Sequence, residues 1–379
     1  MAKIRQNIII LLLLSSFGMY AQKLVLGAER IDKILKTIDN KNIAIVGNQT
    51  SVVNQVHLVD TLISLNQKII SVFSPEHGFR GIEDAGAKVD NEIDKKTGLP
   101  IISLYGKNKK PTSEQLIGID IIIFDIQDVG ARFYTYISTL HYILEACSEK
   151  NIKVVILDRP NPNGHYVDGP ILEEKYKSFV GMHQIPIVHG MTIGEYATMI
   201  VGEKWIENNC NLEIIEMINY NRNDNYELPI KPSPNLPNGK SINLYPSLCL
   251  FEGTNVSVGR GTDKPFQHFG SPSLKFYSYA FQPKSGPGSK YPKHENKTCV
   301  GKNLENYPYL NSINLNWLIE SYNQTNKKED FFNSFFDKLA GTDKLRTQII
   351  SGLNEKEIRS SWKTGLKEFK KTRTKYLLY

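Results

Sequence analysis

Short apolar runs alternate with stretches of helical periodicity between residues 40 and 160, and this alternation constrains the fold more than any other feature of the chain. The apolar runs are 43–46, 68–73, 100–104, 119–124 and 153–157, and the helical stretches are 57–65 and 136–150. A continuous apolar run is typical of a strand that is covered on both faces. The sequence therefore predicts an α/β region built on a parallel, doubly wound sheet.

Polar and ionisable side chains follow each of the five apolar runs. They are Asn48, Gln49 and Thr50 after the first run, Glu76 and His77 after the second, Tyr105 after the third, Asp125, Gln127, Asp128 and Arg132 after the fourth, and Asp158, Arg159 and Asn161 after the fifth. The carboxyl ends of parallel strands lie at one edge of a sheet, and ligands bind in the crevice outside that edge. The sequence therefore predicts a functional site there, with Asn48, Gln127 and Asp158 among its contacts. Asp158 opens a Pro-rich turn, for which a purely structural role is the alternative.

Several common binding and catalytic motifs are absent from the chain. No GxGxxG or GxxxxGK[ST] segment follows the first apolar run, which argues against a nucleotide-binding sheet. No HExxH or CxxC spacing occurs, so a metal site is not expected, and no GxSxG elbow suggests a serine hydrolase. The four cysteines are widely spaced and allow three pairings, although Cys147 lies in a helical pattern and is expected to be a small buried hydrophobe.

The segment 74–78, Ser-Pro-Glu-His-Gly, holds the sharpest candidate for catalysis. Pro75 restricts the residue before it to an extended conformation, and glycine permits a tight turn, so the loop is expected to orient Glu76 and His77. Apolar neighbours on both sides favour the protonated form of a carboxyl, which is the form that a general acid needs. The alternative is that Glu76 caps a helix or forms a salt bridge with Arg80.

The loop after the fourth apolar run holds a second group of candidates. Asp125 and Asp128 are candidates for a second catalytic carboxylate or for binding hydroxyl groups, and Gln127 and Tyr134 lie beside them. Arg132 is a candidate for a bidentate contact with a substrate carboxylate. The alternative is an internal Asp–Arg network that shapes the loop, and for Asp125 this alternative is at least as well supported.

The second half of the chain predicts a smaller α+β domain. Thr192 and Glu195 have the spacing of a capping box and begin a helix, 212–217 alternates like a strand, and Asn354 is expected to cap the last helix. The predicted divisions are a signal peptide at 1–21, a catalytic domain at 22–185 and a domain that closes the cleft at 186–379.

A glycine-rich stretch in the second half supplies further candidates. Glu252, Arg260, Asp263 and Phe266 lie there without an apolar period, which is typical of a loop. A second domain that closes over the first would present these side chains to the cleft. The alternative is a surface loop held by an Arg–Asp pair.

The first residues have the pattern of a signal peptide. Lys3 and Arg5 precede the apolar run 8–14, and Ala21 offers a small residue at a cleavage point. The run is shorter than the roughly 20 residues that a membrane-spanning helix needs, although an uncleaved N-terminal anchor is the alternative. The chain is therefore expected to be periplasmic or secreted, without stable membrane insertion after signal removal and without a nucleic-acid partner.

Seven longer motifs follow one another along the chain. They are Ser-Pro-Glu-His-Gly-Phe-Arg-Gly (74–81), Ser-Leu-Tyr-Gly (103–106), Phe-Asp-Ile-Gln-Asp-Val-Gly-Ala-Arg-Phe-Tyr-Thr-Tyr (124–136), Leu-Asp-Arg-Pro-Asn-Pro (157–162), His-Gly-Met-Thr-Ile-Gly-Glu (189–195), Pro-Ser-Pro-Asn (232–235) and Glu-Gly-Thr-Asn-Val-Ser-Val-Gly-Arg-Gly-Thr (252–262). Together they resemble the NamZ family of exo-acting β-N-acetylmuramidases, glycoside hydrolase family 171, also catalogued as DUF1343. The resemblance runs from Gly27 to Tyr379.

The resemblance implies a fold and a reaction. Such enzymes remove N-acetylmuramic acid from the non-reducing end of peptidoglycan fragments, so MurNAc-GlcNAc saccharides are the implied substrates and no metal or organic cofactor is implied. A Rossmann-like N-terminal domain and a smaller C-terminal domain with a cleft between them are also implied. The family's glutamate in the Glu-His-Gly motif maps onto Glu76.

Glycoside hydrolysis usually needs one protonated and one ionised carboxyl group. Glu76 fits the acid, and its partner is Asp128, Glu252, Asp263 or the substrate's own N-acetyl group. The lactyl carboxylate of muramic acid needs a cation, for which Arg132 and Arg260 are candidates. Stacking surfaces for the sugar are expected from Tyr105, Tyr134 and Phe266.

Two other functions stay open at this point. One is a non-catalytic muropeptide-binding protein, although binding alone needs fewer ionisable groups than the five strand ends carry. The other is an esterase or amidase that acts on cell-wall substituents, which the missing nucleophile elbow and metal ligands disfavour.

Overall fold

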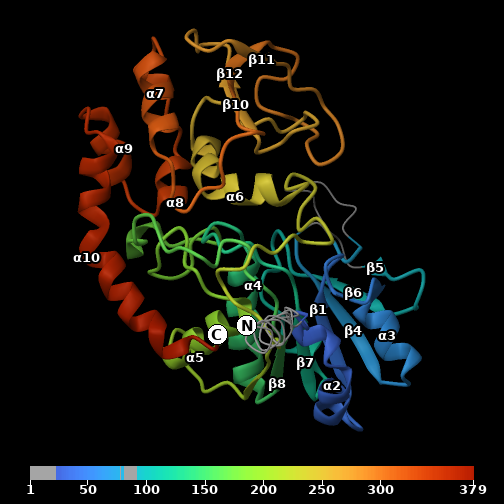
Figure 1. Cartoon of the computed structure of the whole chain (residues 1–379). Helices are drawn as coiled ribbons and strands as arrows, with labels where there is room; N and C mark the ends of the chain where they lie inside the picture. The colour runs from blue at the N-terminus through green and yellow to red at the C-terminus, as the bar shows by residue number, and fades with distance from the viewer. Residues whose placement is uncertain (1–22, 77, 81–91) are drawn as a thin grey trace, which may run out of the picture.

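The computed structural model describes residues 23–76, 78–80 and 92–379. Across these ranges the N-terminal part builds a seven-stranded sheet with helices on both faces, and a smaller domain is stacked on it (Figure 1). The strand order is β5-β6-β4-β1-β7-β8-β9, and only the β5–β6 pair is antiparallel. The strands are β1 (Ile43–Gly47), β4 (Ile69–Ser74), β5 (Glu92–Ile93), β6 (Pro100–Ser103), β7 (Ile121–Asp125), β8 (Lys153–Leu157) and β9 (Leu212–Ile215).

The continuous apolar runs form strands because both faces of the sheet are buried. Successive side chains of a strand point to opposite faces, so Ile43 and Ile45 of β1 pack under α2 (Ile31–Ile38) and α3 (Leu58–Ser64). Ala44 and Val46 pack on the other face, under α4 (Tyr136–Lys150) and α5 (Ile193–Gly202). The hairpin of β2 (Val52–Val53) and β3 (Val56–His57) leads into α3.

The order of the strands creates a switch point between β1 and β7. From β1 the sheet grows through β4 towards one edge, and from β7 it grows through β8 and β9 towards the other. In such sheets the crevice outside the carboxyl ends at the switch point is where ligands bind. The segments that leave β1 and β7 there are 48–51 and 126–134, which are two of the predicted candidate segments.

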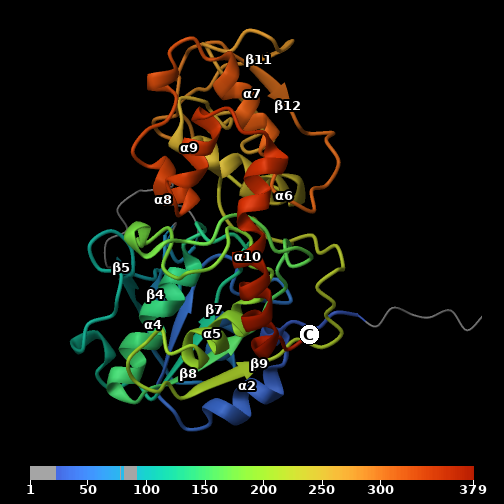
Figure 2. The ribbon, with the colours of Figure 1, turned by 90° about the vertical axis from the view of Figure 1, so that its left-hand side faces the viewer.

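The smaller domain combines helices with an antiparallel sheet. In the part of the chain that is described, this sheet has the order β10 (His268–Ser271), β12 (Cys299–Asn303) and β11 (Tyr279–Phe281). Its helices are α6 (Gly239–Leu248), α7 (Asn316–Gln324), α8 (Phe336–Ala340), α9 (Lys344–Ile350) and α10 (Glu355–Arg373). Helix α10 runs along one side of both domains and ends beside α5 (Figure 2). A single buried apolar cluster continues from the α4 and α5 face of the sheet into this domain.

The α/β fold and the smaller α+β domain are confirmed, and several elements match their predicted bounds. The run 153–157 is β8, and 136–150 is α4. The predicted capping residues Thr192 and Asn354 accept hydrogen bonds from the backbone of Glu195 and Glu357.

One predicted strand lies in an unexpected place. The stretch 212–217 contains β9, which pairs with β8 at the end of the large sheet. The sheet therefore draws on residues on both sides of the predicted division at residue 185.

The N-terminal prediction lies largely outside the described residues, because the segment 1–22 is not among them. Within 23–76, 78–80 and 92–379, every helix is too short or too polar to cross a membrane. All four cysteines lie in these ranges and carry free thiols, and Cys147 is buried in α4 as expected.

Candidate active site

Glu76 and Tyr105 lie together because their strands pair in register. β4 and β6 pair through Ser74 and Ser103, and each functional residue follows two positions later. The hydroxyl group of Tyr105 donates a hydrogen bond to the carboxyl group of Glu76. Burial and the charge of Glu76 raise the pKa of Tyr105 well above its usual range, so the phenol keeps its proton and continues to donate. His77, the next residue of the motif, lies outside the described residues.

Glu76 opens onto a pocket between the two domains, with an empty volume of about 450 Å³. The pocket is lined by Glu76, Phe133, Tyr134, Thr135, Tyr136, Ser233, Asn235, Leu236, Tyr245, Arg260 and Phe266. Four of these were predicted from the sequence: Glu76 and Tyr134 come from the sheet domain, and Arg260 and Phe266 come from the smaller domain. One carboxyl group, one cation and several aromatic rings therefore line the same pocket.

Tyr136 forms the wall next to Glu76, at the start of α4. Burial and the charge of Glu76 raise the pKa of Tyr136 well above its usual range. The side-chain amide of Asn48 donates a hydrogen bond of 2.9 Å to the Tyr136 hydroxyl, and Asn48 itself is fully buried. Asn48 thus supports the pocket wall from behind, whereas the sequence predicted a substrate contact.

Arg260 brings a positive charge to the pocket. Its guanidinium lies over the ring of Phe266 and forms an ion pair of 3.1 Å with Glu252. Burial is the largest single influence and opposes the charged form, but the charge and hydrogen bond of Glu252, together with Tyr245 and Cys249, more than offset burial and raise the pKa of Arg260. Glu252 therefore stands beside the pocket as the partner of Arg260. Asp263, the other predicted carboxylate of this loop, is exposed to solvent.

Asp125 forms an internal ion pair with Arg159. This agrees with the alternative of an internal Asp–Arg network and not with a substrate contact. The two carboxylate oxygens of Asp125 accept hydrogen bonds of 2.5 and 2.9 Å from Arg159, and both side chains are buried. Arg159 also donates to the backbone carbonyl of Val52. This pair joins the end of β7 to the loop after β8.

Arg132 lies away from the pocket, in the interior. Its side chain has no exposed surface, and its terminal nitrogens donate to the backbone carbonyls of Pro170, Ile185, Leu339 and Ala340. The first two carbonyls belong to the segment after β8, and the last two end α8. Arg132 therefore joins the two domains through backbone contacts, whereas the sequence predicted a contact with a substrate carboxylate.

Asp128 is buried behind the pocket. Its Oδ2 accepts a hydrogen bond of 2.6 Å from the backbone of Gly130 and lies 3.8 Å from Nε2 of His189. Its Oδ1 has no hydrogen-bond partner within the described parts of the chain. Burial raises the pKa of Asp128 to about 7. Gln127, which was predicted as a ligand contact, donates to the backbone carbonyls of Asp128 and Pro160.

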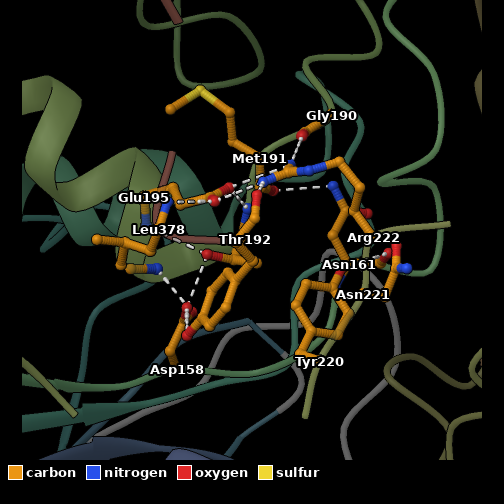
Figure 3. A network of polar contacts seen from close by, with 12 residues as sticks. Asp158, Asn161, Gly190, Met191, Thr192, Glu195, Tyr220, Asn221, Arg222 and Leu378 are labelled. Carbon is orange, nitrogen blue, oxygen red and sulfur yellow. Dashed lines mark hydrogen bonds and ion pairs between the residues drawn. The ribbon is translucent and has the colours of Figure 1, made fainter. Parts of the chain in front are cut away.

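Asp158 lies in a polar network at the base of α5 (Figure 3). It accepts hydrogen bonds from the hydroxyl of Thr192, the backbone of Gly194 and the hydroxyl of Tyr379. Burial raises its pKa to about 7. Asp158 therefore serves the N-terminus of α5 and the docking of the C-terminal residues, outside the pocket.

We expect Asp128→Asn to stabilise the protein at pH 8 and to change little near pH 4. The pKa of Asp128 is about 7 in the folded protein and 3.8 ordinarily. Between these values the folded protein holds a proton that the unfolded chain has released, so the wild type loses stability as the pH rises to about 7 and no more above it. At about 1.4 kcal/mol per pKa unit, the loss is roughly 4 kcal/mol at most.

The amide of the variant stays neutral and keeps the acceptor for Gly130, so the variant should not show this loss. Chemical denaturation of both proteins between pH 4 and pH 8 measures it. Stability curves that stay parallel over this range would contradict a neutral Asp128.

Sequence reasoning missed three kinds of pocket residue. Tyr136 closes the long motif 124–136 but follows the predicted cluster, and its position at the start of a helix was the available signal. Ser233 and Asn235 lie in the motif 232–235, and nothing in the sequence assigned either side chain to the site. Tyr245 lies within α6, where a helical pattern gives no indication that one ring faces a pocket.

Comparisons with known proteins cover the whole of this site. The family model of the N-terminal domain of the exo-β-N-acetylmuramidase NamZ matches residues 43–240, and that of the C-terminal domain matches residues 243–379. The chain is 39% identical over 373 residues to the peptidoglycan β-N-acetylmuramidase NamZ of Bacillus subtilis, across 91% of this chain and 88% of that protein.

Two solved structures of DUF1343 family proteins from Bacteroides fragilis are also similar. One has a TM-score of 0.89 and 48% identity, and the other has a TM-score of 0.80 and 28% identity. In both cases 94% of this chain and 99% of the solved chain are covered.

Proposed function

The chain belongs to the exo-β-N-acetylmuramidase NamZ family, and on this premise we propose that it releases N-acetylmuramic acid from the non-reducing end of peptidoglycan fragments. It is thus a glycoside hydrolase. The observation that carries the assignment of the site is the pocket, which is lined by Glu76 of the sheet domain and by Arg260 and Phe266 of the smaller domain.

Glu76 acts as the general acid in this proposal. A glycosidic oxygen leaves as a hydroxyl group only if it receives a proton, and a positioned carboxylic acid supplies it. The hydrogen bond from Tyr105 orients the carboxyl group of Glu76, and Tyr136 lines the pocket near it. Glu76 is the carboxyl group that lines the pocket among the described residues, which supports its choice over Asp128 and Asp263.

Arg260 binds the lactyl carboxylate of muramic acid. It is the guanidinium that lines the pocket, and its pairing with Glu252 keeps it charged and directed. The rings of Tyr134 and Tyr245 offer stacking surfaces for the sugar. Phe266 is fully buried beneath the Arg260 guanidinium and supports it from behind, whereas the sequence predicted a substrate contact. The second group of the reaction is either Glu252, beside Arg260, or the N-acetyl group of the substrate itself.

Turnover of defined disaccharides tests the function. We expect the protein to split MurNAc-GlcNAc into two monosaccharides and to leave GlcNAc-MurNAc intact, because only the first carries muramic acid at its non-reducing end. Mass spectrometry of the products separates the alternatives. A muropeptide-binding protein would bind the disaccharide without products, and an esterase or amidase would remove acyl or peptide groups and leave the glycosidic bond.

We also propose that the chain acts outside the cytoplasm. The charged and apolar residues at 1–21 support an export signal, and peptidoglycan fragments are found in that compartment. N-terminal sequencing of the mature protein should give Gln22 as its first residue, and an intact Met1 would contradict cleavage.

A further inference from the structure

The segment 284–292 of the smaller domain lies in the connection between β11 and β12 (Figure 1). We call it the rim hairpin, because Gly286 and Ser289 pair within it. The backbone of Lys284 donates to the carbonyl of Gly261, which follows the pocket residue Arg260. The side chain of Asn235, another pocket residue, donates a hydrogen bond of 2.7 Å to the carbonyl of Gly288. The rim hairpin therefore adjoins two walls of the pocket without lining its interior.

A partly buried lysine anchors the end of the rim hairpin. The ammonium group of Lys293 donates to the backbone carbonyls of Phe251, Glu252, Thr254 and Val256. The ring of His294, the next residue, contacts the carbonyl of Asn255 at 2.6 Å. These contacts attach the chain after the hairpin to the segment that carries Glu252. A glycine- and proline-rich loop is thus held in one position relative to the pocket.

The anchored loop presents an aromatic ring to solvent. Tyr291 is 82% exposed, the highest value among the exposed large hydrophobic side chains of the described residues. The next residue, Pro292, is buried against Gly261, so the backbone on that side is held while the ring stays outside. The ammonium group of Lys290 lies over the Tyr291 ring at 5.6 Å. An aromatic ring on an anchored loop loses little conformational freedom when a ligand stacks on it.

We propose that Tyr291 forms a binding subsite for the sugar on the leaving side of the scissile bond, an N-acetylated amino sugar. The inference rests on the proposed function, because an exo-acting enzyme holds the terminal sugar in the pocket and the rest of the saccharide leaves through its mouth. The rim hairpin adjoins that mouth beside Arg260 and Asn235. The apolar face of a sugar ring stacks on a phenol ring, and such aromatic contacts favour binding by up to about tenfold.

Calorimetric titration in a Glu76→Gln background tests the subsite, because that variant is expected to bind without turnover. The probes are N-acetylmuramic acid alone and the disaccharide MurNAc-GlcNAc. We expect Tyr291→Ala to weaken the binding of the disaccharide about tenfold and to leave the Kd of N-acetylmuramic acid unchanged. Tyr291→Phe should bind both probes as the parent does, since the ring is retained.

Phe276→Ala is the matched control, because Phe276 is 80% exposed on the same domain and its backbone contacts Gln324 of α7. It should change neither Kd. The subsite is refuted if Tyr291→Ala leaves the disaccharide Kd unchanged, or if it weakens both probes equally. The proposed function is tested separately, by turnover of the disaccharide by the wild type. The titration measures binding alone, so its result for Tyr291→Ala does not depend on whether the wild type releases N-acetylmuramic acid.

Discussion

Replacing Glu76 by Gln should lower kcat for MurNAc-GlcNAc by about 10²–10⁴-fold while leaving the fold intact. Gln has the size of Glu and keeps an oxygen that accepts the hydrogen bond from Tyr105, so the pocket wall should not change. What the variant lacks is a proton that can be transferred to the glycosidic oxygen. Steady-state release of N-acetylmuramic acid measures the loss, and thermal unfolding verifies the fold.

Glu173→Gln provides the matched control for this experiment. Glu173 is partly exposed, forms an ion pair with Lys344 and accepts a hydrogen bond from the hydroxyl of Thr342. It does not line the pocket that holds Glu76. This variant should turn over substrate at the rate of the wild type. If Glu76→Gln also kept most of its activity, Glu76 would not be the acid, and the pocket would need another proton donor.

Replacing Arg132 by Met should lower the free energy of unfolding by about 3–5 kcal/mol. Met has a similar length but no donors, so the carbonyls of Pro170, Ile185, Leu339 and Ala340 would lose their partner in a buried place. A buried carbonyl that loses its hydrogen-bond donor destabilises the folded protein by more than the loss of a solvent-exposed hydrogen bond does. Chemical denaturation measures the loss, and the activity of the remaining folded protein should keep its KM.

The opposite outcome distinguishes the two interpretations of Arg132. A guanidinium that binds the substrate carboxylate would give a variant of normal stability with a raised KM. Arg346→Met is the control, because Arg346 forms a partly exposed ion pair with Asp337 on the adjacent helices. It should cost no more than about 1 kcal/mol.

Local signals were sufficient to predict the elements that frame the site. The helix 136–150 and the strand 153–157 have the expected bounds because their periodicity and flanking residues are contained within the segment itself. The caps at Thr192 and Asn354 involve partners three residues away, which a short window reveals. The sheet edge was predicted for the same reason, since the polar residues at each strand end are adjacent to the runs that define the strands.

The roles of individual charged residues could not be predicted in the same way. Arg132 and Asp158 have the side chains that a substrate site needs, but their partners lie far along the chain. Arg132 contacts Leu339 and Ala340, which are 207 and 208 positions away. The residues next to a charged side chain in the sequence do not reveal whether it binds distant backbone groups or a ligand. Arg260 and Phe266 were predicted to reach the cleft because they lie in a glycine-rich stretch without apolar periodicity. Such a stretch is typical of a loop, whose side chains are less often needed for the packing of a helix or a strand.

The docking of the C-terminal residues has a consequence for the order in which this protein folds. Glu195 accepts a hydrogen bond from the backbone of Leu378, 183 positions later (Figure 3). Asp158 accepts a hydrogen bond from the hydroxyl of Tyr379, 221 positions later. During synthesis the sheet domain therefore emerges with two buried carboxylates that each lack one donor until residues 378 and 379 have been added. The hydrogen bonds that complete these two carboxylates are thus among the last that the sheet domain can form.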